Sequence, residues 1–349
     1  MKRINSLQRT IDFIEGKKVD RIPFHPILMQ FAAKYAGVNY RDFCINPKVK
    51  CEANIKCARE LGTDWVNVMS DPYAEAEAYG RKVEYPIDSL PLAGEPVIKS
   101  IDDVDKLKIP VISDHERLRA RIKEIELYRE MVGDELFIVG WVEGPLAEYC
   151  DIRDMSEAML DFYIYPEKLE RALDITTQFA REFITAQVKA GAHCIGIGDA
   201  VCSQISPDLY QQFVFEREKV LVQHAHSLGV KVKLHICGNT SAILPDMIKT
   251  GADIIDIDHL VGDMSEFVPF LSENQVFSGN SDPVSVIQDG RTADIYASVE
   301  KCFQQSGGRG IISAGCEVPK NTSLHNFEAY VKAAHSVAGS VRLNINSVK

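Results

Sequence analysis

The residues best suited to chemistry are a histidine and a cysteine two positions apart. His235 and Cys237 lie in "KLHICGNT" (233–240), where an apolar run ends at a glycine turn. Residues i and i+2 of a strand project to the same face, so this imidazole and thiol can converge on one point. A catalytic zinc ion uses three protein ligands and leaves one position open. A third soft ligand is therefore expected elsewhere in the chain.

Cys316 is the candidate for that third ligand. It ends another apolar run, "GIISAGC" (310–316). If both runs are strands of one barrel, their carboxyl ends meet at one face, and His235, Cys237 and Cys316 would form a Cys₂His zinc site. The alternative is packing, because free cysteine usually behaves as a small buried hydrophobe. The other seven cysteines have no ligand partner at short spacing and are expected to pack in this way.

These residues must be positioned by strands, and short apolar runs alternate with helical patterns along the chain. Eight such runs are present: 21–28, 64–70, 136–144, 194–199, 230–238, 253–258, 275–282 and 310–316. This alternation predicts βα units and a (β/α)₈ TIM barrel, an α/β fold formed by residues 1–349 as a single domain. The alternative, an open doubly wound sheet, has little support because no G-x-G-x-x-G follows the first run.

Two further segments complete the predicted barrel. An N-terminal helix is expected at about 5–15, before the first strand. The stretch from about 72 to 134 is too long for one crossover and is expected to form an excursion between strands two and three.

Several polar residues stand where the predicted strands end, and barrel enzymes place their chemistry there. Glu143 and Asp199 each end an apolar run, where burying a charge costs free energy unless the group is paired or binds a ligand. Asp71 precedes a proline and could equally be a helix cap. These three carboxylates are expected to bind substrate or transfer protons. Additional pocket candidates are Tyr73, Asn280 and Glu317.

Composition excludes several classes of partner. The chain has 39 Lys and Arg against 50 Asp and Glu, a net charge of -11, which opposes nucleic acids and anionic membranes. No apolar run approaches the length of a membrane span, and the first residues lack the apolar core of a secretory signal. The chain is expected in the cytoplasm, where its cysteines stay reduced.

Several stretches together resemble the uroporphyrinogen decarboxylase superfamily, and within it the zinc-dependent corrinoid methyltransferases. The matching stretches extend over nearly the whole chain: "DRIPF", "SDPYAEAEAYG", "WVEGPLAEYCD", "GDAVCSQISPDLYQQFVFE", "LHICGNT" and "GCEVPKNTSLHNFEAYVKAAH". The resemblance implies a (β/α)₈ barrel. It also implies that His235, Cys237 and Cys316 are zinc ligands, because they match the H-x-C and distant cysteine of the methyltransferases.

The resemblance leaves two activities open. The decarboxylases hold their polyanionic porphyrinogen with an arginine-rich loop and need no metal, whereas here that loop has no arginine and Lys34 is its only base. Asp71, however, matches their essential aspartate. The methyltransferases move a methyl group between a corrinoid and a small substrate. Glu317 departs from the glycine that coenzyme M enzymes often have, so the substrate is either a thiol acceptor or a methylated donor.

The corrinoid would come from a separate protein. Corrinoid carriers use D-x-H-x-x-G, and "HAHSLG" (224–229) lacks the aspartate. A corrinoid-binding protein is therefore the expected partner. A third hypothesis is a non-catalytic barrel that binds zinc or a corrinoid protein. It would require a closed site, with Glu143 or Glu317 as a fourth ligand.

Overall fold

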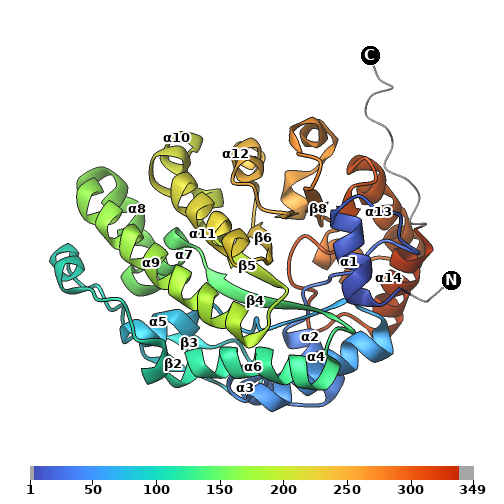
Figure 1. Ribbon diagram of the computed structural model, residues 1–349, viewed down its shortest axis with the longest axis horizontal. Coiled ribbons are helices and arrows are strands. Elements are labelled where there is room, and N and C mark those ends of the chain that lie inside the picture. The colour runs from blue at the N-terminus through green and yellow to red at the C-terminus, as the bar shows by residue number, and fades with distance from the viewer. Residues whose placement is uncertain (1–3, 338–349) are drawn as a thin grey trace.

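The structure is a computed structural model that describes residues 4–337. Its centre is a parallel sheet of seven strands in the order β1-β4-β5-β6-β7-β8-β9, curled on itself (Figure 1). The strands are β1 (Trp65–Asn67), β4 (Phe137–Glu143), β5 (Cys194–Gly198), β6 (Lys231–Ile236), β7 (Ile254–Ile257), β8 (Val276–Ser278) and β9 (Gly310–Ile311). Each lies in one of the predicted runs, from the second to the eighth.

The first predicted run, 21–28, does not form a regular strand. Pro23 and Pro26 lack backbone N–H donors, so a continuous ladder cannot form there. Isolated parallel bridges instead pair Phe24 with Ile312 and Ile27 with Glu317. On its other side the segment meets the chain just before β1, where the backbone N–H of Asp64 donates to the Phe24 carbonyl at 2.9 Å. Complete closure into an eight-stranded barrel stays a prediction.

Helices surround the strands, from α4 and α6 through α9 and α11 to α13 and α14 (Figure 1). The helices are α1 (Ser6–Ile14), α2 (Gln30–Ala36), α3 (Tyr40–Ile45), α4 (Pro47–Leu61), α5 (Tyr73–Tyr79), α6 (Glu116–Val132), α7 (Pro145–Arg153), α8 (Met155–Ile164), α9 (Pro166–Ala190), α10 (Pro207–Leu209), α11 (Phe215–Ser227), α12 (Leu244–Lys249), α13 (Thr292–Gln305) and α14 (Leu324–Ser336).

Helix α9 illustrates why these segments are helical. Pro166 opens its first turn, where no backbone donor is lost, and Gly191 ends it in the left-handed conformation with φ +111°. Leu169, Leu173 and Phe183 lie on its buried side. This apolar face packs against α7, α8 and α11, so burial rather than intrinsic propensity stabilises the helix.

The predicted excursion lies between β1 and β4. It contains α5, a two-stranded antiparallel hairpin of β2 (Val83–Glu84) and β3 (Leu92–Ala93), the 3₁₀ segments Ile101–Lys106 and Ile112–Asp114, and α6. Helix α6 packs against α4, α5 and β4 and carries Arg117 and Arg121 inward. The excursion thereby places two buried arginines on the inner side of α6.

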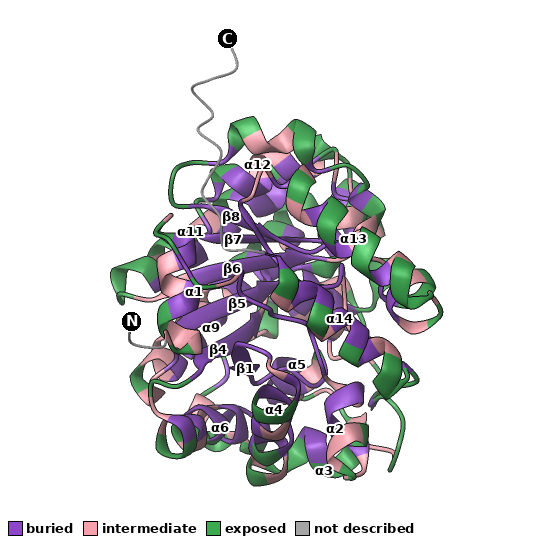
Figure 2. Cartoon of the chain, turned by 90° about the vertical axis from the view of Figure 1, so that its right-hand side faces the viewer, coloured by how far each residue is buried: buried purple, intermediate pink, exposed green. Residues whose placement is uncertain are grey.

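The strands form the buried interior, and the exposed residues lie mainly on the outer faces of the helices (Figure 2). Within residues 4–337, no helix has both the length and the apolar character needed to cross a bilayer. Organisation of residues 1–349 as one domain stays a prediction.

Candidate metal centre

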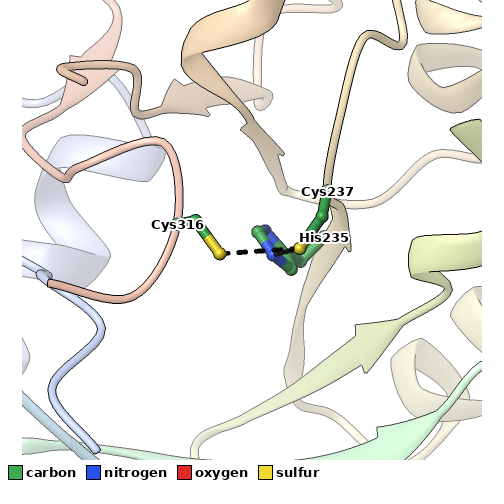
Figure 3. A group of neighbouring side chains, drawn as sticks. All are labelled: His235, Cys237 and Cys316. Carbon is green, nitrogen blue, oxygen red and sulfur yellow. Dashed lines mark hydrogen bonds between the residues drawn. The ribbon is translucent and has the colours of Figure 1, made fainter. Parts of the chain in front are cut away.

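The three predicted ligands converge although 79 residues separate Cys237 from Cys316. The Cys237 sulfur lies 2.9 Å from His235 Nε2 and 3.7 Å from the Cys316 sulfur. Figure 3 shows His235 and Cys237 on the end of β6, with Cys316 facing them from the loop after β9. The ligand atoms of all three side chains lie within 4.8 Å of one another.

Two glycines allow the loops that carry the cysteines to take these positions. Gly238 follows Cys237 at φ +92°, a conformation that ends the strand and that residues with a side chain rarely adopt. Gly315 precedes Cys316, and a Cβ atom on it would lie 2.2 Å from the backbone nitrogen of His259. Only glycine lets the loop of Cys316 approach the end of β7 so closely.

A buried carboxylate orients the histidine. Asp256 is the cross-strand neighbour of His235 on β7, and its Oδ2 lies 2.6 Å from His235 Nδ1. Lys233 lies 2.9 Å from the other carboxylate oxygen. Burial opposes the charge, yet Lys233 and His235 lower the pKa of Asp256 to about 2. An ionised Asp256 fixes the proton on Nδ1 and leaves Nε2 directed at the cysteines, as carboxylates do for metal-bound histidines.

Protons are shared unequally among the three side chains. The hydrogen bond from Cys237, together with that from His235, lowers the pKa of Cys316 to about 4 against the effect of burial. The same hydrogen bond, together with burial, raises the pKa of Cys237. Burial opposes charging of His235, but Asp256 and Cys316 raise its pKa to about 9. One thiolate is therefore already present near neutral pH.

This donor set fits zinc. Two sulfurs and one imidazole nitrogen are the soft ligands that zinc accepts, and the carboxylate on Nδ1 is the usual outer partner of a zinc-bound histidine. The other seven cysteines are all buried, and Cys237 and Cys316 alone are partly exposed. Their accessibility separates them from packing cysteines.

A cavity of about 180 Å³ opens beside the three side chains. Its walls come from the loops at the carboxyl ends of the strands and comprise Ile27, Met29, Met69, Asp71, Pro72, Trp141, Glu143, Gly198, Ala200, His235, Cys237, Cys316 and Glu317. Trp141 points into the sheet interior because β5 has glycine opposite it. A Cβ on Gly196 would lie 2.1 Å from the indole ring.

Asp71 lines the cavity as a paired carboxylate. Arg117 lies 2.5 Å and Arg121 3.8 Å from its Oδ2, and Ser70 donates a hydrogen bond to the same oxygen. Burial opposes the charge, but these arginines lower the pKa of Asp71 to about 2. The group is ionised and its charge is balanced.

Glu143 and Glu317 also line the cavity, and neither forms an ion pair with a cation of the described part of the chain. Trp141 Nε1 donates to Glu143, whose pKa is raised by burial and by the carboxylate of Glu75. The backbone N–H of Gln30 donates to Glu317 at 2.7 Å. Burial raises the pKa of Glu317 to about 7. Both side chains are fixed by neutral donors.

Three predicted site residues lie outside the lining of this cavity. Asp199 is fully buried and accepts hydrogen bonds from the first turn of α7, at 2.7 Å from the Ala147 N–H. Tyr73 begins α5, and its backbone N–H donates to Asp71. Asn280 is buried and donates to the carbonyls of Asp258 and Gly262. The side chains of Asp199 and Asn280 thus hold neighbouring segments in place.

Asp199 belongs to a second cluster of metal-ligand types. Ligand atoms of Asp199, Cys202 and Glu218 lie within 4.8 Å of one another, and all three residues are buried. Tyr210 donates to Glu218 at 2.5 Å. Burial, together with Asp199, raises the pKa of Glu218, and burial raises that of Asp199 to about 6. The two carboxyl groups therefore retain a proton between them.

Sequence reasoning missed several residues of the site. Asp256 was not predicted, because its contact with His235 depends on the register between β6 and β7. Trp141 could have been suspected from the small residues of "CIGIG" (194–198), which leave room for a large neighbour. Glu75 and Glu148 are buried behind Glu143, within helical patterns that gave no signal.

The chain belongs to the uroporphyrinogen decarboxylase (URO-D) family, whose family model matches residues 5–337. This confirms the resemblance drawn from the motifs. Members of this family with different activities are among its relatives.

The chain is 26% identical over 333 residues to a methylcobamide:CoM methyltransferase, MtaA, of Methanosarcina barkeri, covering 93% of this chain and 96% of the relative. It is 23% identical over 346 residues to a uroporphyrinogen decarboxylase of Geobacter metallireducens, covering 92% and 97%. A solved methyltransferase from Methanosarcina mazei shares the fold with a TM-score of 0.86 at 23% identity, covering 95% of this chain and 98% of that one. The relatives are enzymes of two kinds.

Proposed function

We propose that this protein is a zinc-dependent methyltransferase that moves a methyl group between a corrinoid, carried by a partner protein, and a small substrate. The observation that carries the proposal is the convergence of His235, Cys237 and Cys316 at the wall of a cavity. Similarity to methylcobamide:CoM methyltransferases over nearly the whole chain supports the same activity.

The three side chains would hold the zinc ion, and Asp256 would keep His235 in the tautomer that presents Nε2. Bound zinc supplies a Lewis acid that lowers the pKa of a thiol or polarises a methylated heteroatom. Glu317 does not supply a fourth ligand in this proposal, because Gln30 holds its carboxylate. The group of ligand atoms formed by described residues has three members, which suits an open catalytic site rather than a closed structural one.

The cavity limits what can react. About 180 Å³ suits a molecule of a few heavy atoms and is well below the several hundred Å³ of a pocket for a large ligand. Its walls position the substrate beside the cysteines, and Trp141 with Met29 and Met69 excludes water from the reacting groups. The corrinoid would approach from outside, at the carboxyl ends of the strands, on its own protein. We also propose that this protein functions in the cytoplasm, where its cysteine thiols would stay reduced.

A second candidate is uroporphyrinogen decarboxylation. It is favoured by an ionised Asp71 in the cavity wall and by the similarity to decarboxylases. Against it, no arginine of residues 4–337 lines the cavity to hold the many carboxylates of a porphyrinogen. Both arginines nearest to Asp71 are occupied in pairing with it.

Chelation separates the two candidates. Purified protein is assayed with methylcobalamin and a thiol, following the visible spectrum of the corrinoid, and with uroporphyrinogen, before and after removal of metal. The proposal expects methyl transfer that is lost on chelation and restored by zinc. Porphyrinogen decarboxylation that survives chelation, with no methyl transfer, would establish the second candidate instead.

A further inference from the structure

The cavity beside the metal centre has only acidic residues among its charged side chains, histidine aside. Asp71, Glu143 and Glu317 line it, and no lysine or arginine does within residues 4–337. A carboxyl group supplies no positive charge in either protonation state. A substrate with a carboxylate, sulfonate or phosphate would therefore find no cation to pair with in this wall.

The cations nearest to the cavity are already engaged. Arg117 and Arg121 lie behind Asp71 and are paired with it, with side chains that are 10% and 3% exposed. Lys320 lines a neighbouring cavity and donates to the carbonyl of Asp88 at 3.3 Å. None of them is in the lining beside the cysteines.

Zinc itself would not reverse this balance. Two thiolates and a neutral imidazole would compensate the double charge of the ion, so bound zinc would leave no net positive charge to attract an anion. Among the wall carboxyl groups, Asp71 is balanced by its arginines. Glu143 and Glu317 are the two acidic groups of the wall that no arginine pairs with among the described residues.

Glu317 is the better placed of these two to select substrates. It follows Cys316 directly, and the bridge between Ile27 and Glu317 fixes its backbone. One carboxylate oxygen accepts the Gln30 N–H, so the side chain cannot swing away without losing that bond. An acidic group is thereby held beside the position where a substrate must bind.

We propose that the substrate of this site is a small neutral or cationic molecule, such as an uncharged thiol or a methylated amine, and that Glu317 excludes anionic ones. This rests on the proposed function and names its substrate class. Glu317 acts as a specificity-determining residue, through its charge and not as a metal ligand.

Three thiols that share a two-carbon chain test the proposal: cysteamine, 2-mercaptoethanol and 2-mercaptoethanesulfonate. Binding to the zinc-containing full chain is measured by calorimetry. The cationic and neutral thiols should bind at least about tenfold more tightly than the sulfonate, because like charges placed together oppose binding. Glu317→Gln keeps the shape and the bond from Gln30 and should narrow this gap severalfold. Glu273→Gln, at an exposed position, should leave it unchanged.

A second measurement is independent of methyl transfer. Cationic and anionic methanethiosulfonate reagents modify accessible thiols, and Cys237 and Cys316 are the cysteines that are not fully buried. In metal-stripped full chain, the cationic reagent should be favoured beyond its advantage with a free thiol in solution. Glu317→Gln should reduce that preference.

The outcomes separate the two proposals. Equal or tighter binding of the sulfonate, or a charge preference that Glu317→Gln leaves intact, would overturn the assignment of substrate class while zinc-dependent methyl transfer could still stand. A chain that binds no zinc and none of the thiols would overturn the proposed function. In that case the reagent preference would still establish, or refute, the acidic character of the cavity.

Discussion

Two clusters of metal-ligand residues lie at neighbouring strand ends, and they differ in whether a ligand from outside the protein can reach their polar atoms. His235, Cys237 and Cys316, after β6 and β9, border a cavity, and both of their cysteines are partly exposed. Asp199 and Cys202, after β5, and Glu218, on α11, are sealed inside the protein. Ligand types within reach of one another are thus insufficient to define a metal site.

The sealed cluster has used its bonding capacity within the protein. Asp199 accepts from the first turn of α7, and Glu218 accepts from Tyr210 and Cys202. Its role is to join α7 and α11 to the end of β5. The side chains of the cavity cluster bond to one another, and they line a cavity from which a ligand can reach them.

The comparison is tested most strongly by removing one cysteine at a time. Cys237→Ala and Cys316→Ala should lose essentially all zinc, because two ligands cannot retain it. Cys202→Ala should keep the full zinc content and lose about 1 kcal/mol of stability as a small buried group is removed. Metal analysis of the purified variants measures this. Loss of zinc from Cys202→Ala would make the sealed cluster the metal site.

The proton in the sealed cluster predicts a pH dependence of stability. Burial raises the pKa of Asp199 to about 6, above its value in the unfolded chain, so the folded state binds the proton more tightly. Its contribution to the unfolding free energy is therefore greatest below about pH 4 and declines as pH rises to about 6, by about 3 kcal/mol. The decline should be smaller in Asp199→Asn, in which Glu218 is left as the titrating group of this cluster. Urea denaturation of both proteins between pH 4 and 7 measures it, and parallel curves would contradict it.

The carboxylate behind His235 should matter to metal affinity. Asp256→Asn weakens the acceptor for Nδ1 and should lower zinc affinity about 10-fold to 100-fold, as loss of such partners usually does. Asp253→Asn, at the other end of β7, is the matched control. It disturbs bonds to His226 and Lys231, and it should cost stability without changing zinc affinity. Competition with a chromophoric chelator measures both, and equal losses would mean a general effect of destabilisation.

The approach of the Cys316 loop to β7 gives the smallest effect. Gly315→Ala places a Cβ 2.2 Å from a backbone nitrogen, so the loop must shift, and zinc affinity should fall about 5-fold. Gly251→Ala is the control, because it strains the backbone at φ +89° but brings its Cβ into open space. Gly251→Ala should lower the stability of the fold and leave zinc affinity unchanged. Unchanged affinity in Gly315→Ala would show that the loop tolerates displacement.

Sequence reasoning located most of the sheet and the three proposed ligands. Alternation of apolar runs with helical patterns predicted seven of the seven strands of the sheet, and the spacing of His235 and Cys237 placed both side chains together. The apolar run 21–28 also predicts a strand, the first along the chain, but its two prolines restrict it to isolated bridges. Period and hydrophobicity identify a strand, whereas ladder formation also depends on backbone donors.

Side-chain direction at the strand ends was harder to predict. Glu143 and Asp199 both end apolar runs, and the sequence predicts the same role for each. Glu143 lines the cavity, whereas Asp199 points toward the start of α7. The difference depends on the helix start that packs against Asp199. The contact of Asp256 with His235 cannot be predicted from a local pattern, because it depends on the register between β6 and β7. Such contacts depend on packing between segments that no local pattern records.

The isolated bridges between segment 21–28 and the chain after β9 also have a consequence for the order in which the site forms during synthesis. Ile27 supports the backbone at Glu317, next to Cys316, so the first and the last parts of the chain hold the third ligand together. A growing chain that has already formed β6 still lacks this ligand until residue 316 has been added. The set of proposed metal ligands is therefore complete only after every strand of the sheet has been synthesised, and a premature stop between residues 237 and 316 would leave His235 and Cys237 without the third ligand.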